Sequence, residues 1–398
     1  MFVRPTPLRL LALSLGILGA VAVVAAETAP LEYNRDIRPI LSENCFYCHG
    51  PDANKREAKL RLDIRDEALK QKAFIPGDAA GSELVKRLFS KDEDEVMPPP
   101  EAHRTVTAAQ KETLKRWIAA GAPYEEHWAF VAPRRAPLPT VGERHPIDTF
   151  VTERLKQAGL TLSAEAPREI LLRRLALDLT GLPPTPEETA TFVADRSPDA
   201  YEKQVDRLLA SVHYGERMVL PWLDASRYAD SNGFQQDGDT YQWVWRDWMV
   251  RQLNADKPFD QLTTELLAGD LLPNATTEQK LATAFNRNHI LNGEGGNIAE
   301  EQRYVSLFDR VDTVSTTWLG LTLACAQCHD HKYDPLTQED YYSLFAIFGS
   351  IDERGVYGAN FEQARAYPAR LDYAPPELRG KQAAVDAEVE SNAQRIRD

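Results

Sequence analysis

Apolar side chains recur at helical spacing along most of the chain beyond residue 31. In the segment from 147 to 155 they lie at 147, 150, 151 and 155, and the segment from 170 to 179 shows the same amphipathic pattern. Further helices are expected at about 198–211, 213–229, 241–255, 259–268, 277–287 and 299–323. No segment shows the strict alternation of apolar and polar residues that indicates a strand. The pattern therefore predicts a mostly α-helical fold.

Two capping boxes indicate where helices begin. Thr107 with Gln110, and Thr185 with Glu188, place a hydroxyl and a carboxyl or amide side chain three residues apart, directly before an apolar repeat. The repeat after Thr107 ends at Gly121, a residue typical of helix C-termini. We therefore expect one helix from about 108 to 120 and another after Thr185.

All four cysteines belong to two copies of one pentapeptide, Cys45–His49 and Cys325–His329. This Cys-x-x-Cys-His pattern is the attachment signature of c-type haem. Thiols three residues apart on a helical turn can each add to a vinyl group of the porphyrin, and the adjacent imidazole can bind the iron. The first copy therefore predicts haem c held by Cys45, Cys48 and His49.

The second copy leaves three interpretations open. Cys325, Cys328 and His329 are followed closely by His331. We favour a second haem c, because the same pattern should be processed in the same way. A zinc site with two thiolates and two imidazoles is the next alternative, although histidines this close crowd a tetrahedral site. A disulfide between the two cysteines is the third.

The second axial ligands are expected outside the pentapeptides. Met97 lies in a segment that Pro98, Pro99 and Pro100 hold extended, so its sulfur can bind the far face of the first haem. A His/Met pair fills both axial positions, which suits electron transfer. For a second haem we favour His289, in the glycine-rich loop 288–296, as the ligand. The alternatives are a structural role for His289, or ligation by His213, Met218 or Met249.

The first 26 residues have the features of a secretory signal. Arg4 and Arg9 precede an apolar run from 10 to 26 that ends in small residues, as at a cleavage site. A membrane anchor is the alternative, but the run is short for a bilayer. We therefore expect a periplasmic or other extracytoplasmic protein that is soluble after cleavage of the signal.

The charge of the chain excludes one class of partner. The formal net charge is -14, whereas nucleic-acid surfaces depend on clustered Lys and Arg. We expect redox proteins as partners, either a dehydrogenase or other cytochromes. Charged residues of the second half of the chain form either a polar site beside the second haem or salt-bridged helix faces; they are Asp224, Arg227, Asp230, Glu300, Glu301, Arg303, Asp309, Arg310 and Asp312.

Several longer motifs resemble a known family. They are YNRDIRPI at 33–40, MPP at 97–99, WIAAGAP at 117–123, HWAF at 127–130, DLTGLPP at 178–184, HYGER at 213–217 and the run 325–342. On these motifs the chain resembles the secreted planctomycete-type cytochrome c proteins over about residues 31–350. In that family a cytochrome domain precedes a second domain of unknown function with its own Cys-x-x-Cys-His. The resemblance implies Cys45, Cys48, His49 and Met97 as haem residues and a secreted redox role, and it implies no substrate.

These observations predict a two-domain organisation. We expect a small class I-like cytochrome c domain and a larger all-helical domain, joined by a proline-rich linker. The expected boundaries are a signal peptide at 1–26, the cytochrome domain at 31–125, the linker at 126–146, the helical domain at 147–350 and a C-terminal extension at 351–398.

The predicted function is electron transfer between periplasmic redox partners by an exported dihaem c-type cytochrome. Two alternatives belong to other classes. In one, the second domain is an oxidoreductase acting on a carbohydrate or peroxide. In the other, the protein is a binding module with zinc at the second motif. We favour electron transfer over a self-contained enzyme, because a His/Met haem offers no open iron position.

Overall fold

The computed structural model describes residues 30–139, 145–233, 237–292, 296–355, 370–376 and 378–397. Within these ranges the regular elements are all helices and no strand is present, which confirms the predicted mostly α-helical fold. The expected signal segment, residues 140–144 of the expected linker, residues 293–295 of the glycine-rich loop and 356–369 of the C-terminal extension lie outside the described residues.

The chain divides into two units, which are described separately. The first comprises Met1–Phe46 and Leu60–Trp128, and the second comprises Tyr47–Lys59 and Ala129–Asp398. The division passes through the first pentapeptide, directly after Phe46. The five expected segment boundaries stay predictions.

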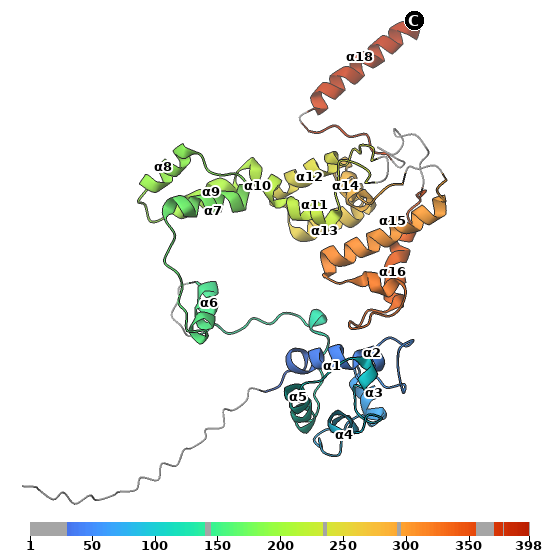
Figure 1. Ribbon diagram of the computed structural model, residues 1–398. Helices are drawn as coiled ribbons and strands as arrows, with labels where there is room; N and C mark the ends of the chain where they lie inside the picture. Colours follow the sequence, from blue (N-terminus) through green and yellow to red (C-terminus); the bar gives the residue numbers. More distant parts are fainter. Residues whose placement is uncertain are drawn as a thin grey trace, which may run out of the picture. The chain divides into compact units, whose positions relative to one another are not determined.

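The first unit is a small helical body (Figure 1). Its elements are η1 (Tyr33–Ile37), α1 (Arg38–Asn44), the first residue of α2 (Phe46–His49), α3 (Arg65–Lys70), α4 (Glu83–Phe89), η2 (Pro100–Ala102) and α5 (Ala108–Ala119). Trp117 of α5 is buried, and its Nε1 donates to the Pro123 carbonyl at 2.9 Å. The rings of Tyr33 and Tyr124 stack beside it, with centroids 4.5 Å apart. An aromatic core therefore ties the end of α5 to the N-terminal helices.

The capping box expected at Thr107 is present. The Thr107 hydroxyl accepts from the backbone N–H of Gln110 at 3.2 Å, and the Gln110 side chain accepts from the N–H of Thr107 at 2.8 Å. α5 begins directly after this box. Its C-terminal side is closed by Gly121, whose φ of +98° lies in the region that glycine adopts without strain.

The second unit contains the remaining helices (Figure 1). They are η3 (Trp128–Phe130), α6 (Pro146–Gln157), α7 (Arg168–Thr180), α8 (Pro186–Ala194), α9 (Ala200–Leu209), α10 (Val212–Met218), α11 (Leu220–Ser226), α12 (Trp243–Asn254), α13 (Phe259–Ala268), η4 (Gly269–Leu271), α14 (Thr277–Ala282), η5 (Thr283–Arg287), α15 (Ala299–Val314), η6 (Ser315–Leu319), η7 (Leu323–Gln327), α16 (Gln338–Gly349) and α18 (Arg379–Arg397). The first residue of η3, Trp128, belongs to the first unit in the division above.

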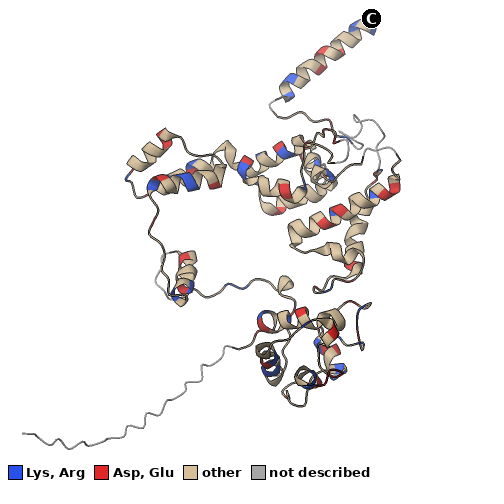
Figure 2. Ribbon diagram, viewed as in Figure 1, with Lys and Arg blue, Asp and Glu red and all other residues tan. Residues whose placement is uncertain are grey.

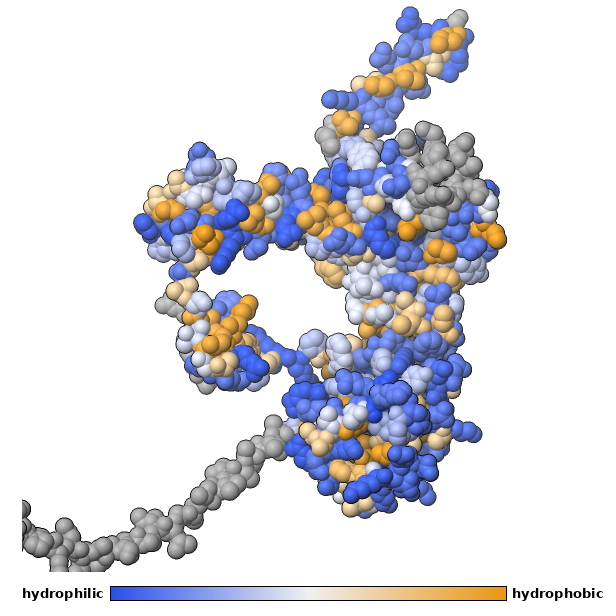
Figure 3. Space-filling model, in the orientation of Figure 1, coloured by the Kyte–Doolittle hydropathy of each residue, from blue (hydrophilic) through white to orange (hydrophobic). Residues whose placement is uncertain are grey.

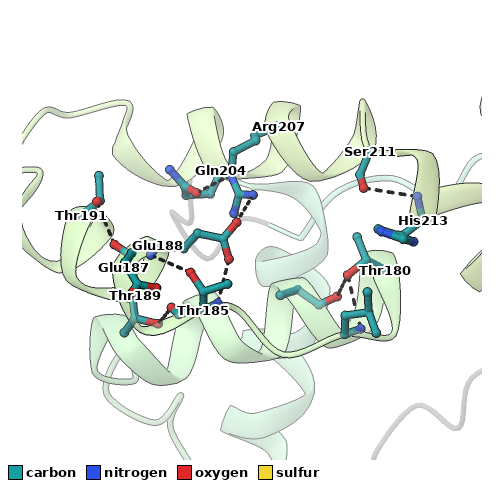
Figure 4. A network of polar contacts seen from close by, with 12 residues as sticks. Thr180, Thr185, Glu187, Glu188, Thr189, Thr191, Gln204, Arg207, Ser211 and His213 are labelled. Carbon is teal, nitrogen blue, oxygen red and sulfur yellow. Dashed lines mark hydrogen bonds and ion pairs between the residues drawn. The ribbon is translucent and has the colours of Figure 1, made fainter.

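The expected capping box at Thr185 starts α8 (Figure 4). The hydroxyl of Thr185 accepts from the N–H of Glu188 at 3.1 Å, and Glu188 accepts from the N–H of Thr185 at 2.8 Å. The second carboxylate oxygen of Glu188 accepts from Arg207 of α9 at 2.6 Å. One glutamate therefore caps its own helix and joins it to the next.

Two helices begin or end differently from the expected pattern. The helix expected at 213–229 is split into α10 and α11, because Pro221 has no backbone N–H to continue the hydrogen-bond ladder. The helix expected to run to residue 323 ends at Leu319, where Gly320 takes a left-handed φ of +62°. The second pentapeptide therefore begins in a separate 3-10 helix, η7.

The core of the second unit forms around α12 and α15. Trp245 and Trp248 of α12 are fully buried with Leu307 and Val311 of α15 and Tyr341 of α16. Helix packing therefore accounts for these two tryptophans. α18 differs from the other long helices, because none of its described side chains is buried. Its apolar side chains stand among hydrophilic ones in Figure 3.

Candidate haem-binding sites

The first motif lies on a helical turn. Cys45 caps the end of α1, with its N–H donating to the Leu41 carbonyl at 2.8 Å, and Cys48 and His49 belong to α2. Phe46 between the cysteines is buried in the core of the first unit, whereas Cys45 and Cys48 are half-buried. The buried phenylalanine therefore fixes the turn from which the two thiols project.

Met97 follows α4 in a bend, where its peptide bond to Pro98 is cis, and not in the fully extended segment that the prolines predict. Its backbone N–H donates to the Arg87 carbonyl at 3.1 Å, and its side chain is half-buried. Pro99, two residues after Met97, has the extended backbone angles expected of this proline run. Coordination of the iron by the Met97 sulfur stays a prediction.

The second motif turns its cysteines outward. In η7 the apolar residues Leu323 and Ala326 are buried in the core, and Cys325 and Cys328 are exposed. The two thiols form no disulfide. This arrangement anchors the motif by its apolar residues and leaves both sulfurs accessible for covalent attachment.

His329 has the protonation that an iron ligand requires. Its Nδ1 lies 2.8 Å from the Asp330 carbonyl oxygen. A carbonyl only accepts hydrogen bonds, so in the neutral ring Nδ1 carries the proton and Nε2 keeps its lone pair. Metal-binding histidines are commonly oriented by this kind of bond.

His331 has the opposite arrangement. Its Nδ1 accepts from the backbone N–H of Asp334 at 2.9 Å and from that of Tyr333 at 3.2 Å. The proton of the neutral ring is therefore on Nε2, and neither nitrogen offers a lone pair to a metal. His331 closes the loop after the motif and is unsuited to the zinc site considered above. Among the described residues, no group of three or more His, Cys, Asp or Glu side chains is placed to hold a metal ion.

His289 is buried and engaged at both nitrogens. Nδ1 donates to the Ile290 carbonyl at 3.1 Å, and Nε2 accepts from Arg310 at 2.9 Å. Burial, and then the Arg310 charge, lower the pKa of His289 to about 3, so the ring is neutral. The nitrogen that would bind iron is the one that holds Arg310. Iron ligation by His289 stays a prediction, and it requires the loss of this bond.

Comparison with known families gives two matches, in the order that the sequence motifs indicate. Residues 146–353 match a family described as a protein of unknown function, DUF1549, and residues 45–101 match Planctomycete cytochrome C. The first match covers more than half of the chain. The chain belongs to the DUF1549 family. No curated protein and no solved structure matches it.

The cytochrome match of this DUF1549 protein implies haem c. The residues of both motifs fit that group, because each offers two thiols and an imidazole on one short segment. When bound, haem c supplies an iron that cycles between two oxidation states. The second motif fits haem c most clearly, because it combines two exposed thiols for attachment with an Nε2 lone pair on His329 for the iron.

A buried ion pair lies behind the loop of His289. Arg310 of α15 is 2% exposed and binds Glu353 with two nitrogens, one of them at 2.8 Å from Oε2. Its Nε donates to the Asn286 carbonyl at 2.7 Å. The sequence placed Arg310 in a polar set but gave no signal for Glu353, which lies beyond the expected end of the helical domain at residue 350.

A second polar group, which includes Asp309 and Asp312, lies on either side of Arg310 in the sequence of α15 of the DUF1549 domain. Asp309 Oδ2 forms an ion pair with Arg227 Nη2 at 2.7 Å, but the geometry of this contact is not that of a hydrogen bond. Arg227 caps α11 with a left-handed φ of +58°, a conformation that a side chain makes unfavourable. Asp312 lies one turn after Asp309, and Figure 2 marks acidic positions along the ribbon of α15. Tyr341 of α16 adds a fully buried hydroxyl without a hydrogen-bond partner.

Proposed function

We propose that this DUF1549 protein is an exported dihaem c-type cytochrome that transfers electrons between redox proteins of the periplasm. The observation that carries the proposal is the second motif, whose exposed thiols and His329 tautomer are those required for haem attachment. The first motif is supported by the Planctomycete cytochrome C match. Export is supported by the signal-like residues 1–26, which precede both motifs.

The oxidised and reduced states of two haems on one chain allow it to accept an electron from one partner and pass it to another. The protein's own contribution is to hold each haem and set its potential through the axial ligands and the burial of the site. A dehydrogenase or another cytochrome is the proposed donor or acceptor.

The hydrogen bonds of His331 argue against the zinc alternative, because its Nδ1 already accepts two backbone N–H groups. A second haem is therefore the better account of Cys325, Cys328 and His329.

His289 favours a second candidate function. Arg310 occupies its Nε2, and without another protein ligand the second iron would have an open position. An open iron binds peroxide or another small ligand. The candidate is a haem-dependent oxidoreductase in the DUF1549 domain, acting on peroxide or on a carbohydrate. A high-spin spectrum that changes on addition of cyanide or peroxide would support this candidate, whereas a low-spin spectrum unaffected by either would exclude it.

The haem count tests the main proposal. Pyridine haemochrome analysis with protein quantitation should find two haems per chain after expression with a haem c maturation system. The double variant C325A/C328A should retain one haem, and the matched variant C45A/C48A should also retain one. A wild-type count of one, unchanged in C325A/C328A, would remove the second haem.

A further inference from the structure

Asp312 and Tyr341 present buried polar atoms that nothing in the described structure pairs. The Oδ1 atom of Asp312 and the hydroxyl of Tyr341 are inaccessible to solvent and have no hydrogen-bond partner among the described residues. A carboxylate oxygen in this position loses its hydration without a compensating bond, which favours the neutral acid. The Asp312 residue as a whole is only half-buried, so protons can exchange with solvent.

The charged groups around Asp312 come from several elements. On its own helix, α15, lie Asp309 and the buried Arg310; Arg227 approaches from the end of α11, and Tyr341 from α16. Burial, and then the charge of Asp309, raise the pKa of Asp312 to about 6 against the opposing effect of Arg227. The positive charge of Arg227 offsets the negative charge of Asp312 only in part, because its Nη2 is paired with Asp309.

Tyr341 connects Asp312 to the second motif. Burial, and then the charge of Asp312, raise the pKa of the Tyr341 hydroxyl, and Cys328 lies within electrostatic range of the same hydroxyl. The neighbouring Tyr342 fastens α16 to the motif, because its hydroxyl donates to the Gln327 carbonyl at 3.1 Å. Ala326 of the motif belongs to the same buried core as Tyr341. Asp312 and the second motif therefore both lie within electrostatic range of one buried hydroxyl, that of Tyr341.

We propose that Asp312 is a proton-binding site coupled to the second haem. With haem c attached at the second motif, the Asp312 carboxylate would take one proton from solvent for each electron that a donor supplies to the iron, and it would become a carboxylic acid. Reoxidation returns the electron to an acceptor and the proton to solvent. As a general scale, two unit charges about 10 Å apart in a medium of effective dielectric constant about 20 change each other's binding constant for a proton or an electron roughly tenfold. This inference rests on the proposed second haem.

The test is a spectroelectrochemical titration of the dihaem holoprotein between pH 5 and 8. The midpoint potential of the second centre should fall with rising pH from about pH 6 to about pH 7, and it should be flat on either side. In Asp312→Asn, which keeps the shape of the side chain but cannot ionise, this dependence should disappear. Glu339→Gln is the matched control, because it removes one exposed carboxylate from the helix that carries Tyr341 and should leave the dependence intact.

A second measurement needs no variant. Reduction of the wild-type protein at pH 6.5 in a weakly buffered solution with an indicator dye should take up about half a proton at the second centre. A haem count of two with a flat potential and no proton uptake would overturn the proton site alone. A haem count of one would overturn the proposed function as well. If the midpoint potential of D312N still falls with rising pH, the proton binds to another group and not to Asp312.

Discussion

Arg310 Nη2 lies 2.9 Å from His289 Nε2, and the same guanidinium binds both carboxylate oxygens of Glu353. The guanidinium can only donate, so His289 must accept with Nε2 and carry its proton on Nδ1. A buried neutral histidine is thereby combined with a buried ion pair in one network. The network joins the glycine-rich loop to α15 and to the segment after α16.

The neutral state of His289 predicts a pH-dependent stability. The pKa of His289 is lowered to about 3 in the folded protein, whereas an unfolded histidine titrates near 6.5. Between these values the unfolded state binds a proton that the native state does not, so stability falls as pH decreases. From pH 7 to pH 5 the free energy of unfolding should fall by about 2 kcal/mol because of this residue.

His289→Gln tests the prediction, because the amide oxygen can accept from Arg310 without titrating. Denaturant unfolding of the variant at pH 7 and pH 5 should show a drop smaller than that of the wild type by this amount. The control is His213→Gln, in an exposed histidine paired with Glu216 at 2.7 Å, which should behave like the wild type. Equal drops in H289Q and the wild type would mean that His289 is already protonated in the native state.

The buried ion pair of Arg310 and Glu353 predicts a large loss in the free energy of unfolding when one partner is removed. Arg310→Met leaves the Glu353 carboxylate buried without its counter-charge, and we expect a loss of about 3–5 kcal/mol in the free energy of unfolding. The double variant R310M/E353M should lose less than R310M alone, because no isolated charge remains.

Arg207 provides the control for this experiment. Its ion pair with Glu188 is similar in length but partly exposed, and removal of an exposed partner costs up to about 1 kcal/mol. Arg207→Met should therefore have a small effect on unfolding by denaturant. A loss in R310M no greater than that in R207M would show that the buried pair contributes no more than a surface pair.

The helical fold could be predicted from local sequence signals, whereas the buried polar network could not. Thr107 and Thr185 begin helices because a capping box is contained within four residues, and the structure forms both. Pairing of Glu353 with Arg310 joins residues far apart in sequence, and no periodicity encodes such a contact. The break between α10 and α11 could have been predicted from Pro221, since proline cannot continue the hydrogen-bond ladder. The apolar spacing across this proline is helical, and it led to the expectation of one continuous helix.

In the candidate sites, too, the sequence predicts the local features, whereas the contacts between distant segments are known only from the fold. The Cys-x-x-Cys-His pattern identifies thiols and imidazole by itself, because all the reactive groups lie within five residues. The tautomers of His329 and His331 depend on which backbone groups surround each ring, so they required the folded chain. Tyr341 was part of a recognised motif, but only its burial within range of the Asp312 charge connects it to the proposed proton site.

Met97 gives a prediction for the first haem. Met97→Ala should abolish the methionine-sulfur charge-transfer absorbance of the oxidised protein and lower the potential of one centre, because thioether ligation raises haem potentials. Met218→Ala is the control, as Met218 is also half-buried but belongs to α10 of the second unit. If M97A keeps the band and M218A loses it, the sulfur ligand belongs to the second haem.

His331 allows the haem and zinc interpretations of the second motif to be separated by two substitutions. The side-chain oxygen of asparagine replaces Nδ1, and that of glutamine replaces Nε2. Because Nδ1 accepts from Tyr333 and Asp334, His331→Asn should keep both the second haem and the stability of the loop. His331→Gln should lose about 1–3 kcal/mol in the free energy of unfolding, since buried donors are left unpaired.

The opposite order would follow if Nε2 were a zinc ligand. H331Q would then keep more metal than H331N, and elemental analysis would find zinc in the wild type in proportion to the protein. The two variants place an amide oxygen at different ring-nitrogen positions, so haem count, zinc content and unfolding midpoint measured on both decide the role of this residue. Equal haem counts in both variants, no zinc, and a lower unfolding midpoint in H331Q alone are the results expected from a histidine that closes the loop after the haem motif.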